Sequence, residues 1–288
     1  MPDFGIFRGF NEKLFGDKLF VGQLPINLGN NFDIDAAAFF QRVSDAGGTL
    51  SDTEKIAILT LVADLKNRDI WTPMKAIYPM VGASAAACAQ NLKSSSFTGT
   101  FTSGWTFAST GATPNGTSAY MNTGLSPTVN LTNYSAHSSV YNRLTGSNSG
   151  FDLGITNQSG SFLNEFLLAS RRAGNSISAF YDFNNPLSQV VVSAANGQGF
   201  FNGSITSNTS QKLYKNGTSI GSNTNLNIST PSNFPIYLGA VNNQNTSAVE
   251  FTQNQYAFMS IGDGLTDTQA SNFYTAVQAF QTTLGRQV

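Results

Sequence analysis

LYKNGTSIGS, residues 213–222, is the stretch of sequence from which the fold is best predicted. Asn216 and Gly217 stand between two short alternating runs, and this pair favours a type I′ hairpin, whose two central residues both need positive φ. Counting outward from the turn gives the expected cross-strand pairs Lys215–Thr218, Tyr214–Ser219 and Leu213–Ile220. Leu213 and Ile220 then share one face, so the stretch predicts a half-buried antiparallel ribbon.

The same two-residue period recurs along most of the chain after Phe97, with Gly, Asn, Ser and Pro between the alternating runs. The runs predict strands over 97–101, 104–109, 117–122, 136–143, 151–155, 166–171, 176–181, 188–194, 198–206, 211–215, 218–222, 235–240 and 254–261. PNG at 114–116 predicts a second hairpin turn. Many short strands without intervening helices favour a mainly β, two-sheet antiparallel sandwich.

Two segments carry capping boxes, in which a Ser or Thr and a Glu or Gln three residues later satisfy each other's backbone amides. The first box is Ser51 with Glu54, and the second is Thr266 with Gln269. An apolar stripe follows each box: Ile58, Leu61, Val62 and Leu65, then Phe273, Val277, Phe280 and Leu284. We therefore expect a helix after Ser51 and a C-terminal helix over 267–284, ended by Gly285.

Two further segments before residue 92 carry weaker signals. Residues 35–43 are a weaker helix candidate, and WTPMKAIYPMVG, residues 71–82, contains Pro73 and Pro79. Because proline disfavours both helices and central strands, we expect 71–82 to be a tight connector.

These patterns divide the chain into an extended aromatic and glycine-rich anchoring arm over 1–30, a small helical region over 31–92, and a β-sandwich with its C-terminal helix over 93–288. The arm's aromatic residues are Phe4, Phe7, Phe10, Phe15 and Phe20. Burying each ring is worth about 1.5–3 kcal/mol, so the arm should pack on an apolar surface. That surface is either its own domain or another protein.

The composition excludes several classes of partner. The 288 residues have a net charge of −1, and only 11% are charged, so no electrostatic field exists to attract nucleic acid or an anionic membrane. No segment reaches the roughly 18 apolar residues of a membrane span, and the N-terminus lacks a secretory pattern. Cys88 is the only cysteine, which excludes an intrachain disulfide. We expect a protein made and folded in a cytosol, with no membrane insertion.

Several segments together resemble the laminin-G-like, concanavalin A-like jelly roll of bacteriophage virion proteins, which include tail fibres, head fibres and capsid-decorating proteins. The segments, in order, are NLKSSSFTGTFTSGWTF (91–107), PNGTSAYMNTGLSP (114–127), SAHSSVYNR (135–143), KLYKNGTSIGS (212–222), PIYLGAVNNQN (235–245) and FMSIGDGLTDTQASNFYTAVQAFQTTLG (258–285). The resemblance covers about residues 91–288. It implies a jelly-roll fold, preceded by the helical region and closed by the C-terminal helix, in a virion protein.

Catalysis is not expected from the available side chains. A glycoside hydrolase needs two carboxyl groups roughly 5–9.5 Å apart. Residues 93–262 contain only four carboxylates, well separated in sequence: Asp152, Glu165, Asp182 and Glu250. His137 is the only histidine and lies among serines, but no nucleophile-elbow motif accompanies it, so we interpret it as a hydrogen-bonded strand histidine.

No cofactor is predicted from the residues themselves. Laminin-G-like domains often hold one Ca²⁺ ion, and the resemblance therefore implies that such a site could exist here. Asp152, Asp182 and Asp263 are the available carboxylates, and the sequence does not select among them.

Glycan binding needs aromatic faces and hydrogen-bonding side chains on an accessible surface. The candidate residues are Tyr120, Tyr134, Tyr141 and Tyr181 with the loop from Asn242 through Asn243 to Asn245. The alternative is that the tyrosines pack on the sheets and the asparagines make turns. The leading hypothesis is a non-enzymatic virion structural protein, a homo-oligomer that attaches to capsid or tail proteins and displays a sandwich able to contact host surface glycans. The alternatives are a dedicated receptor-binding lectin and a polysaccharide depolymerase.

Overall fold

The computed structural model describes residues 33–132, 134–145, 150–159, 162–172, 174, 176–182, 188–226 and 231–288. The predicted anchoring arm over 1–30, with Phe4, Phe7, Phe10, Phe15 and Phe20, lies outside the described residues, so its role stays a prediction.

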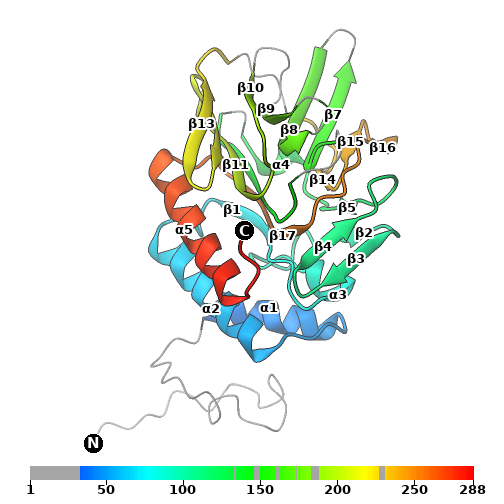
Figure 1. Ribbon diagram of the computed structural model, residues 1–288, viewed down its shortest axis with the longest axis vertical. Helices are drawn as coiled ribbons and strands as arrows, with labels where there is room; N and C mark the ends of the chain where they lie inside the picture. Colours follow the sequence, from blue (N-terminus) through cyan, green and yellow to red (C-terminus); the bar gives the residue numbers. More distant parts are fainter. Residues whose placement is uncertain are drawn as a thin grey trace, which may run out of the picture.

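Two sheets form the sandwich (Figure 1). Sheet A has the strand order β13-β12-β11-β6-β17-β4-β3, with β1 also paired to β17. Its strands are β1 (Met74–Tyr78), β3 (Trp105–Ala108), β4 (Gly111–Pro114), β6 (Ala136–Asn142), β11 (Gly199–Ser207), β12 (Ser210–Lys215), β13 (Thr218–Asn223) and β17 (Tyr256–Gly262). All of these pairings are antiparallel.

Sheet B has the order β10-β9-β8-β7-β14-β5-β2, and β15 pairs with both β7 and β16. Its strands are β2 (Thr100–Phe101), β5 (Met121–Asn122), β7 (Leu153–Ser159), β8 (Phe162–Arg172), β9 (Ile177–Asp182), β10 (Gln189–Ser193), β14 (Tyr237–Leu238), β15 (Val241–Asn243) and β16 (Ser247–Val249). The β15–β7 pairing is parallel, and the other described pairings are antiparallel. The predicted mainly β, two-sheet antiparallel sandwich is therefore confirmed.

The 213–222 hairpin forms as β12 and β13. Asn216 and Gly217 have φ values of 49° and 74°, as a type I′ turn requires. The predicted pairs Lys215–Thr218 and Tyr214–Ser219 are present, but a bulge after them pairs Leu213 with Gly221 instead of Ile220. Leu213 is still buried and Ile220 still packs against the same core, so the predicted faces are correct.

The two helices predicted from capping boxes, which follow Ser51 and Thr266, begin where predicted. The helices are α1 (Ile34–Asp45), α2 (Asp52–Asn67), α3 (Ala85–Cys88), α4 (Pro127–Asn130) and α5 (Asp267–Thr283). Both predicted capping boxes are formed, at Ser51 and at Thr266, and Gly285 follows α5 with a φ of 64°. No described helix is both long enough and apolar enough to cross a membrane.

The main core lies between the two sheets. Phe166 and Phe180 of sheet B meet Val140, Phe201 and Met259 of sheet A. Gly203 of β11 makes room for this packing, because a Cβ there would lie 2.2 Å from the Phe180 ring.

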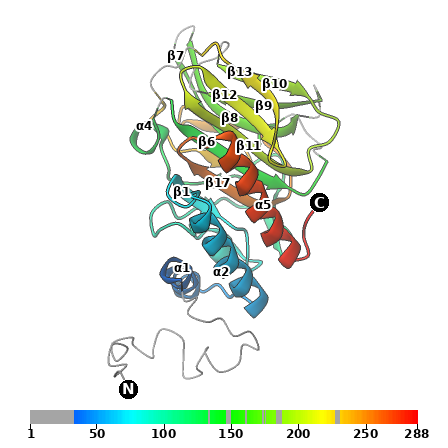
Figure 2. The ribbon, with the colours of Figure 1, turned by 90° about the vertical axis from the view of Figure 1, so that its left-hand side faces the viewer.

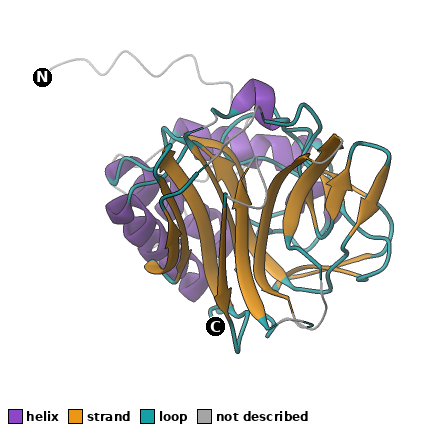
Figure 3. Cartoon of the chain, turned by 90° about the horizontal axis from the view of Figure 1, so that it is seen from above, coloured by secondary structure: helices purple, strands orange, loops and turns teal. Residues whose placement is uncertain are grey.

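A second core lies between the outer face of sheet A and the helices. Tyr141, Phe200 and Phe258 point outward from β6, β11 and β17 and pack against residues of α1, α2 and α5. Figure 2 shows α5 and α2 beside each other across these strands, and Figure 3 shows the strands as curved layers with helices packed around them. The helical region before residue 92 thus shares a core with the sandwich, while the predicted division of the chain at that point stays a prediction.

Two further local predictions are wrong, and three more strands were not predicted. Residues 71–82 are not only a connector, because Met74–Tyr78 form β1 on the edge of β17. PNG at 114–116 does not join a hairpin, because β4 pairs with β3 and β17 in sheet A while β5 belongs to sheet B. The strands β4, β15 and β16 had no counterpart among the predicted strands.

Candidate functional site

The residues predicted to contact a glycan fall on different parts of the sandwich. Tyr141 lies on the outer face of sheet A, where it is buried and its hydroxyl donates to Gln278 Oε1 at 2.9 Å. Tyr120 stacks on Tyr237 near the β5 edge, with ring centroids 4.3 Å apart. Tyr141 is therefore on the opposite side of the sandwich from Tyr181, whereas Tyr120 stacks on a ring that points outward from the same sheet as Tyr181.

Asn242 and Asn243 lie on β15, beside β7 in sheet B. The Asn242 side chain is buried, donates from Nδ2 to the Pro235 carbonyl at 2.7 Å and accepts from the Asn245 amide at 2.9 Å. These two bonds hold the β15–β16 turn. Asn243 is half-buried and lies directly beside Thr156 of β7.

Tyr181 and Asn243 belong to the outer face of sheet B, which we call the open face. Its apolar part is a small cluster of Phe151, Leu167, Ala169, Ala179 and Val241, against which Tyr181 and Val249 pack. Every described member of this cluster comes from a strand or a strand end, and none comes from a helix. The open face thus differs from the outer face of sheet A, which the helices cover.

Strand register arranges the open face as two parallel rows. Val241 lies beside Gly154, and Leu167 lies beside Tyr181, which gives an apolar row that ends in an aromatic ring. The next row along the strands is polar. It consists of Asn243 on β15, Thr156 on β7 and Glu165 on β8, with Thr156 Oγ1 3.5 Å from Glu165 Oε1.

The rim of the open face contains an ion pair and two aromatic rings that pack edge to face. Phe151 packs edge-on against Tyr181 at 5.5 Å, and the Arg172 guanidinium lies 4.4 Å from the centre of the Phe151 ring. Arg172 Nη2 also contacts Glu250 Oε2 at 2.7 Å. Partial burial raises the pKa of Tyr181, so its hydroxyl stays protonated and can donate at neutral pH.

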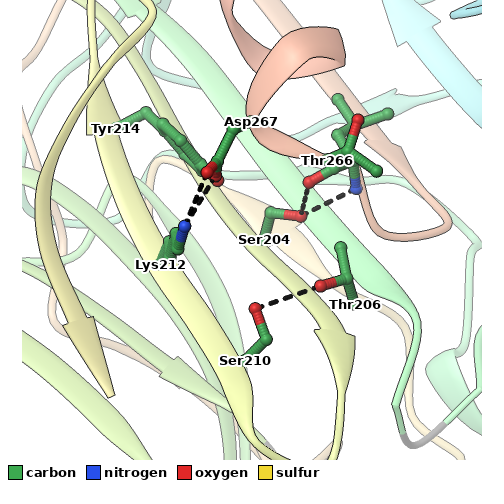
Figure 4. Close-up of a pocket in the computed structure, with 8 residues that line it drawn as sticks. Ser204, Thr206, Ser210, Lys212, Tyr214, Thr266 and Asp267 are labelled. Atoms are coloured by element: carbon green, nitrogen blue, oxygen red, sulfur yellow. Dashed lines mark hydrogen bonds and ion pairs between the residues drawn. The ribbon is translucent and has the colours of Figure 1, made fainter. Parts of the chain in front are cut away.

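A separate polar pocket of about 200 Å³ lies where β11 and β12 meet the start of α5 (Figure 4). Lys212 and Tyr214 point toward the Asp267 carboxylate: Nζ lies 2.8 and 2.7 Å from its two oxygens, and the Tyr214 hydroxyl lies 2.5 Å from Oδ1. These bonds lower the pKa of Asp267. Thr206 Oγ1 and Ser210 Oγ face each other at 3.1 Å.

His137 is the hydrogen-bonded strand histidine that the sequence predicts. It is fully buried on β6, with Nδ1 2.6 Å from the Asp263 carbonyl and Nε2 3.1 Å from Ser260 Oγ. Ser260 in turn contacts Ser139 at 2.7 Å. Burial lowers the pKa of His137 to about 4, so the imidazole is neutral at physiological pH.

Two of the carboxylates considered for calcium, Asp152 and Asp263, have separate partners. Asp152 is buried, where its Oδ1 accepts from Asn254 at 2.6 Å and from Tyr256 at 2.9 Å, and burial raises its pKa. Asp263 pairs with Lys75 at 2.9 Å. Within the described ranges, no group of three or more His, Cys, Asp or Glu side chains is arranged to hold a metal ion.

Several solved structures are similar to this chain. Domain 4 of AbnA, a GH43 extracellular arabinanase from Geobacillus stearothermophilus solved in complex with arabinotriose, aligns with a TM-score of 0.51 and 18% identity, over 69% of this chain and 97% of that domain. A Trypanosoma rangeli sialidase in complex with 2,3-difluorosialic acid gives 0.49 and 8% identity, over 76% and 38%. The CBM40 of a Ruminococcus gnavus IT-sialidase gives 0.34 and 14% identity, over 47% and 79%.

The similarity to the arabinanase domain shows that the two share a β-sandwich fold. Neither a protein-family model nor a curated relative matches the sequence.

The polar row and the pocket contain residues that sequence reasoning missed as candidates. Thr156 carries no local signal, and it meets Asn243 only because β15 runs parallel to β7. Lys212 and Asp267 are 55 residues apart, and only the packing of α5 on sheet A brings them together.

Proposed function

We propose that this protein is a non-enzymatic virion component of a tailed phage, a fibre, spike or decoration protein whose sandwich binds host surface glycans through its open face. The arrangement of the open face is the observation that carries the glycan-binding part of the proposal. A half-buried tyrosine ends an apolar row, and Asn243, Thr156 and Glu165 form a hydrogen-bonding row beside it.

This combination is suited to sugars because their two kinds of surface need different partners. The C–H face of a sugar ring packs on an aromatic or apolar surface, and its hydroxyls need both donors and acceptors. The carboxylate of Glu165 accepts, the Thr156 hydroxyl does both, and the Asn243 amide offers one group of each kind. The sandwich fold shared with an arabinanase domain that was solved with arabinotriose is consistent with this use.

The test of this binding is the full chain on an array of bacterial surface glycans. We expect binding by the unchanged protein and a loss of about ten-fold or more in Tyr181→Ala, since one stacking ring carries much of a sugar contact. Tyr134→Ala is the matched control, because Tyr134 is 44% exposed but precedes β6, away from the open face. Equal binding by wild type and Tyr181→Ala would contradict the open-face site.

The virion part of the proposal is supported by the sequence resemblance and by the aromatic arm over 1–30. Deleting residues 1–30 should leave a folded sandwich that binds glycan but no longer enters phage particles. Normal incorporation of the truncated protein would contradict anchoring by the arm. The copy number of the full-length protein in purified particles would distinguish a head decoration from a tail appendage.

The absence of catalysis is also part of the proposal. Asp152 is buried and fully hydrogen-bonded, and Glu250 pairs with Arg172, so two of the sandwich carboxylates already have structural partners. Release of reducing sugar from host capsule, lost in Glu165→Gln, would favour the depolymerase alternative. Strong, selective array binding by a protein present in only a few copies per particle would favour the receptor-binding lectin.

A further inference from the structure

The pocket at the start of α5 has hydrogen-bonding capacity that its own contacts do not use. Lys212 directs two of its three N–H groups to Asp267, and a carboxylate with three donors can accept a further one. The Ser210 hydroxyl accepts from Thr206, which leaves its own O–H free to donate within the described contacts. The pocket therefore offers donors and an acceptor to a small molecule.

Asn202 does not line the pocket itself, but it supplies an independent observation beside it. It is 1% exposed, and within the part of the chain that the structure describes neither its Oδ1 nor its Nδ2 has a hydrogen-bond partner. A buried amide without partners is costly, so native proteins rarely retain one without a reason. In the register of β11 and β12, Asn202 lies directly opposite Tyr214, and it precedes Ser204 by two residues on the same face.

The side chains opposite Asn202 on the two neighbouring strands form hydrogen bonds with other groups. The Tyr214 hydroxyl donates to Asp267, and Ser139, which lies opposite Asn202 on β6, contacts Ser260. Tyr214 and Ser204 both line the pocket, and directly opposed strand residues have Cβ atoms about 4.5–5.5 Å apart. The unpaired amide is thus next to the pocket wall that Tyr214 and Ser204 form.

We propose that this pocket is a second binding site, which takes one neutral sugar residue and pairs one of its hydroxyls with the Asn202 amide. A hydroxyl both donates and accepts, so it matches an amide whose two groups are both unpaired. In the bound state this hydroxyl passes between Tyr214 and Ser204, while Lys212, Asp267 and Ser210 bind the outer hydroxyls.

Charge and size define the ligand class. Lys212 and Asp267 neutralise each other, so the pocket has no net positive charge to attract an acidic sugar. Its volume of about 200 Å³ is smaller than the roughly 300–1,000 Å³ of pockets for drug-sized ligands. A single ring therefore fits better than an oligosaccharide.

The test uses the full chain and ligand-observed saturation-transfer NMR with the methyl glycosides of glucose, galactose and arabinose. We expect at least one to bind, and methyl glucuronide to bind more weakly. Asn202→Leu, a nearly isosteric change, should weaken binding about ten-fold or more and raise the melting temperature, because it removes an unpaired buried amide. Unchanged binding in Asn202→Leu, or no binding of any neutral glycoside, would overturn the proposal.

If Asn202→Leu does not fold, substitutions of two lysines on β12 provide a second test of the site. Lys212→Met should weaken binding by a factor of about three to ten, whereas Lys215→Met on the same strand should not, because Lys215 bonds to the Asn196 carbonyl outside the pocket. Equal effects of both variants would count against the site. Tyr181→Ala should leave this binding unchanged, and its loss in that variant would assign the signal to the open face instead.

Discussion

The outer faces of the two sheets are built from similar strands, but described helices pack only on the outer face of sheet A. On sheet A, the rings of Phe200, Phe258 and Tyr141 are covered by helices and are at most 1% exposed. On sheet B, the open face has a smaller apolar cluster, and Tyr181 at its edge remains half-buried. The described helices thus stabilise one face and leave the other accessible.

This difference separates stability from binding within one sandwich. Sheet A is closed by α5 and by the region before residue 92, so substitutions there should act mainly on the free energy of unfolding. The open face contributes less buried area, so substitutions there should act mainly on ligand affinity. The three predictions below test that separation, in order of decreasing effect on stability.

The largest effect is expected from removing one ring on each face. Phe258→Ala should lower the free energy of unfolding by about 3–5 kcal/mol, because Phe258 contacts the rings of Phe200, Phe273 and Phe280 and the cavity left behind cannot close. Phe151→Ala on the open face should cost about 1–2 kcal/mol, since that ring lies at the edge of a small cluster. Urea unfolding measures both values, and equal losses would show that the two faces are equally important for stability.

His137, on the outer face of sheet A, is expected to make the free energy of unfolding depend on pH. Its pKa is about 4 in the folded chain, against 6.5 as its ordinary value, because the ring is buried beside Ser260 and Phe273. Between these two pH values, His137 is therefore protonated in the unfolded chain and neutral in the folded chain. The stability contributed by neutral His137 is complete above pH 6.5 and is lost as the pH falls toward 4, by about 3 kcal/mol.

Urea unfolding of wild type and His137→Asn at pH 7, 5.5 and 4.5 measures this contribution. The wild type should lose more stability than the variant over that range. Asp152, whose pKa is raised by burial, is present in both proteins, so its contribution of opposite sign cancels in the difference. Lys75 and the Asp263 carboxylate, the charged groups that act on the imidazole, are also present in both proteins. Parallel pH profiles would contradict the prediction.

Local sequence predicted most of the elements but not how distant elements meet. The hairpin turn, both capping boxes and most strands follow from residues close together in sequence, and each is present. The bulge that shifts Leu213 onto Gly221 was not predicted, because packing of Gly221 against Val190 and Val192 of the other sheet accompanies it. The strand β1 was missed because two prolines flank it and its partner β17 lies about 180 residues later.

The sites depend even more on contacts between distant segments. Tyr181 and Asn243 were proposed from residue type, but the row that joins Asn243, Thr156 and Glu165 depends on the register of three strands. Asn202 gave no signal at all, because an asparagine in a strand is unremarkable until its neighbours are known to bond elsewhere. Arg286 was missed for the same reason, since its partners come from three separate segments.

The smallest of the three effects is expected from Arg286, which lies in the segment after α5 and is 1% exposed. Its guanidinium donates to the carbonyls of Pro79, Met80 and Ala257 at 2.7–2.8 Å and to Gln281 Oε1 at 2.6 Å. It thereby joins the chain after β1 to β17. Burial lowers its pKa to about 10, so it remains charged at neutral pH.

Arg286→Met should lower the free energy of unfolding by about 2 kcal/mol, because several buried carbonyls lose a charged donor. Arg286→Lys should recover only part of this loss, since one ammonium cannot reproduce the planar fork that reaches three segments. Lys55→Met on α2, an exchange at a partly exposed ion pair, is the control and should stay within about 0.5 kcal/mol of wild type. Full recovery of stability in Arg286→Lys would mean that a positive charge is sufficient here, and that the simultaneous hydrogen bonds of the guanidinium to four acceptors are not needed.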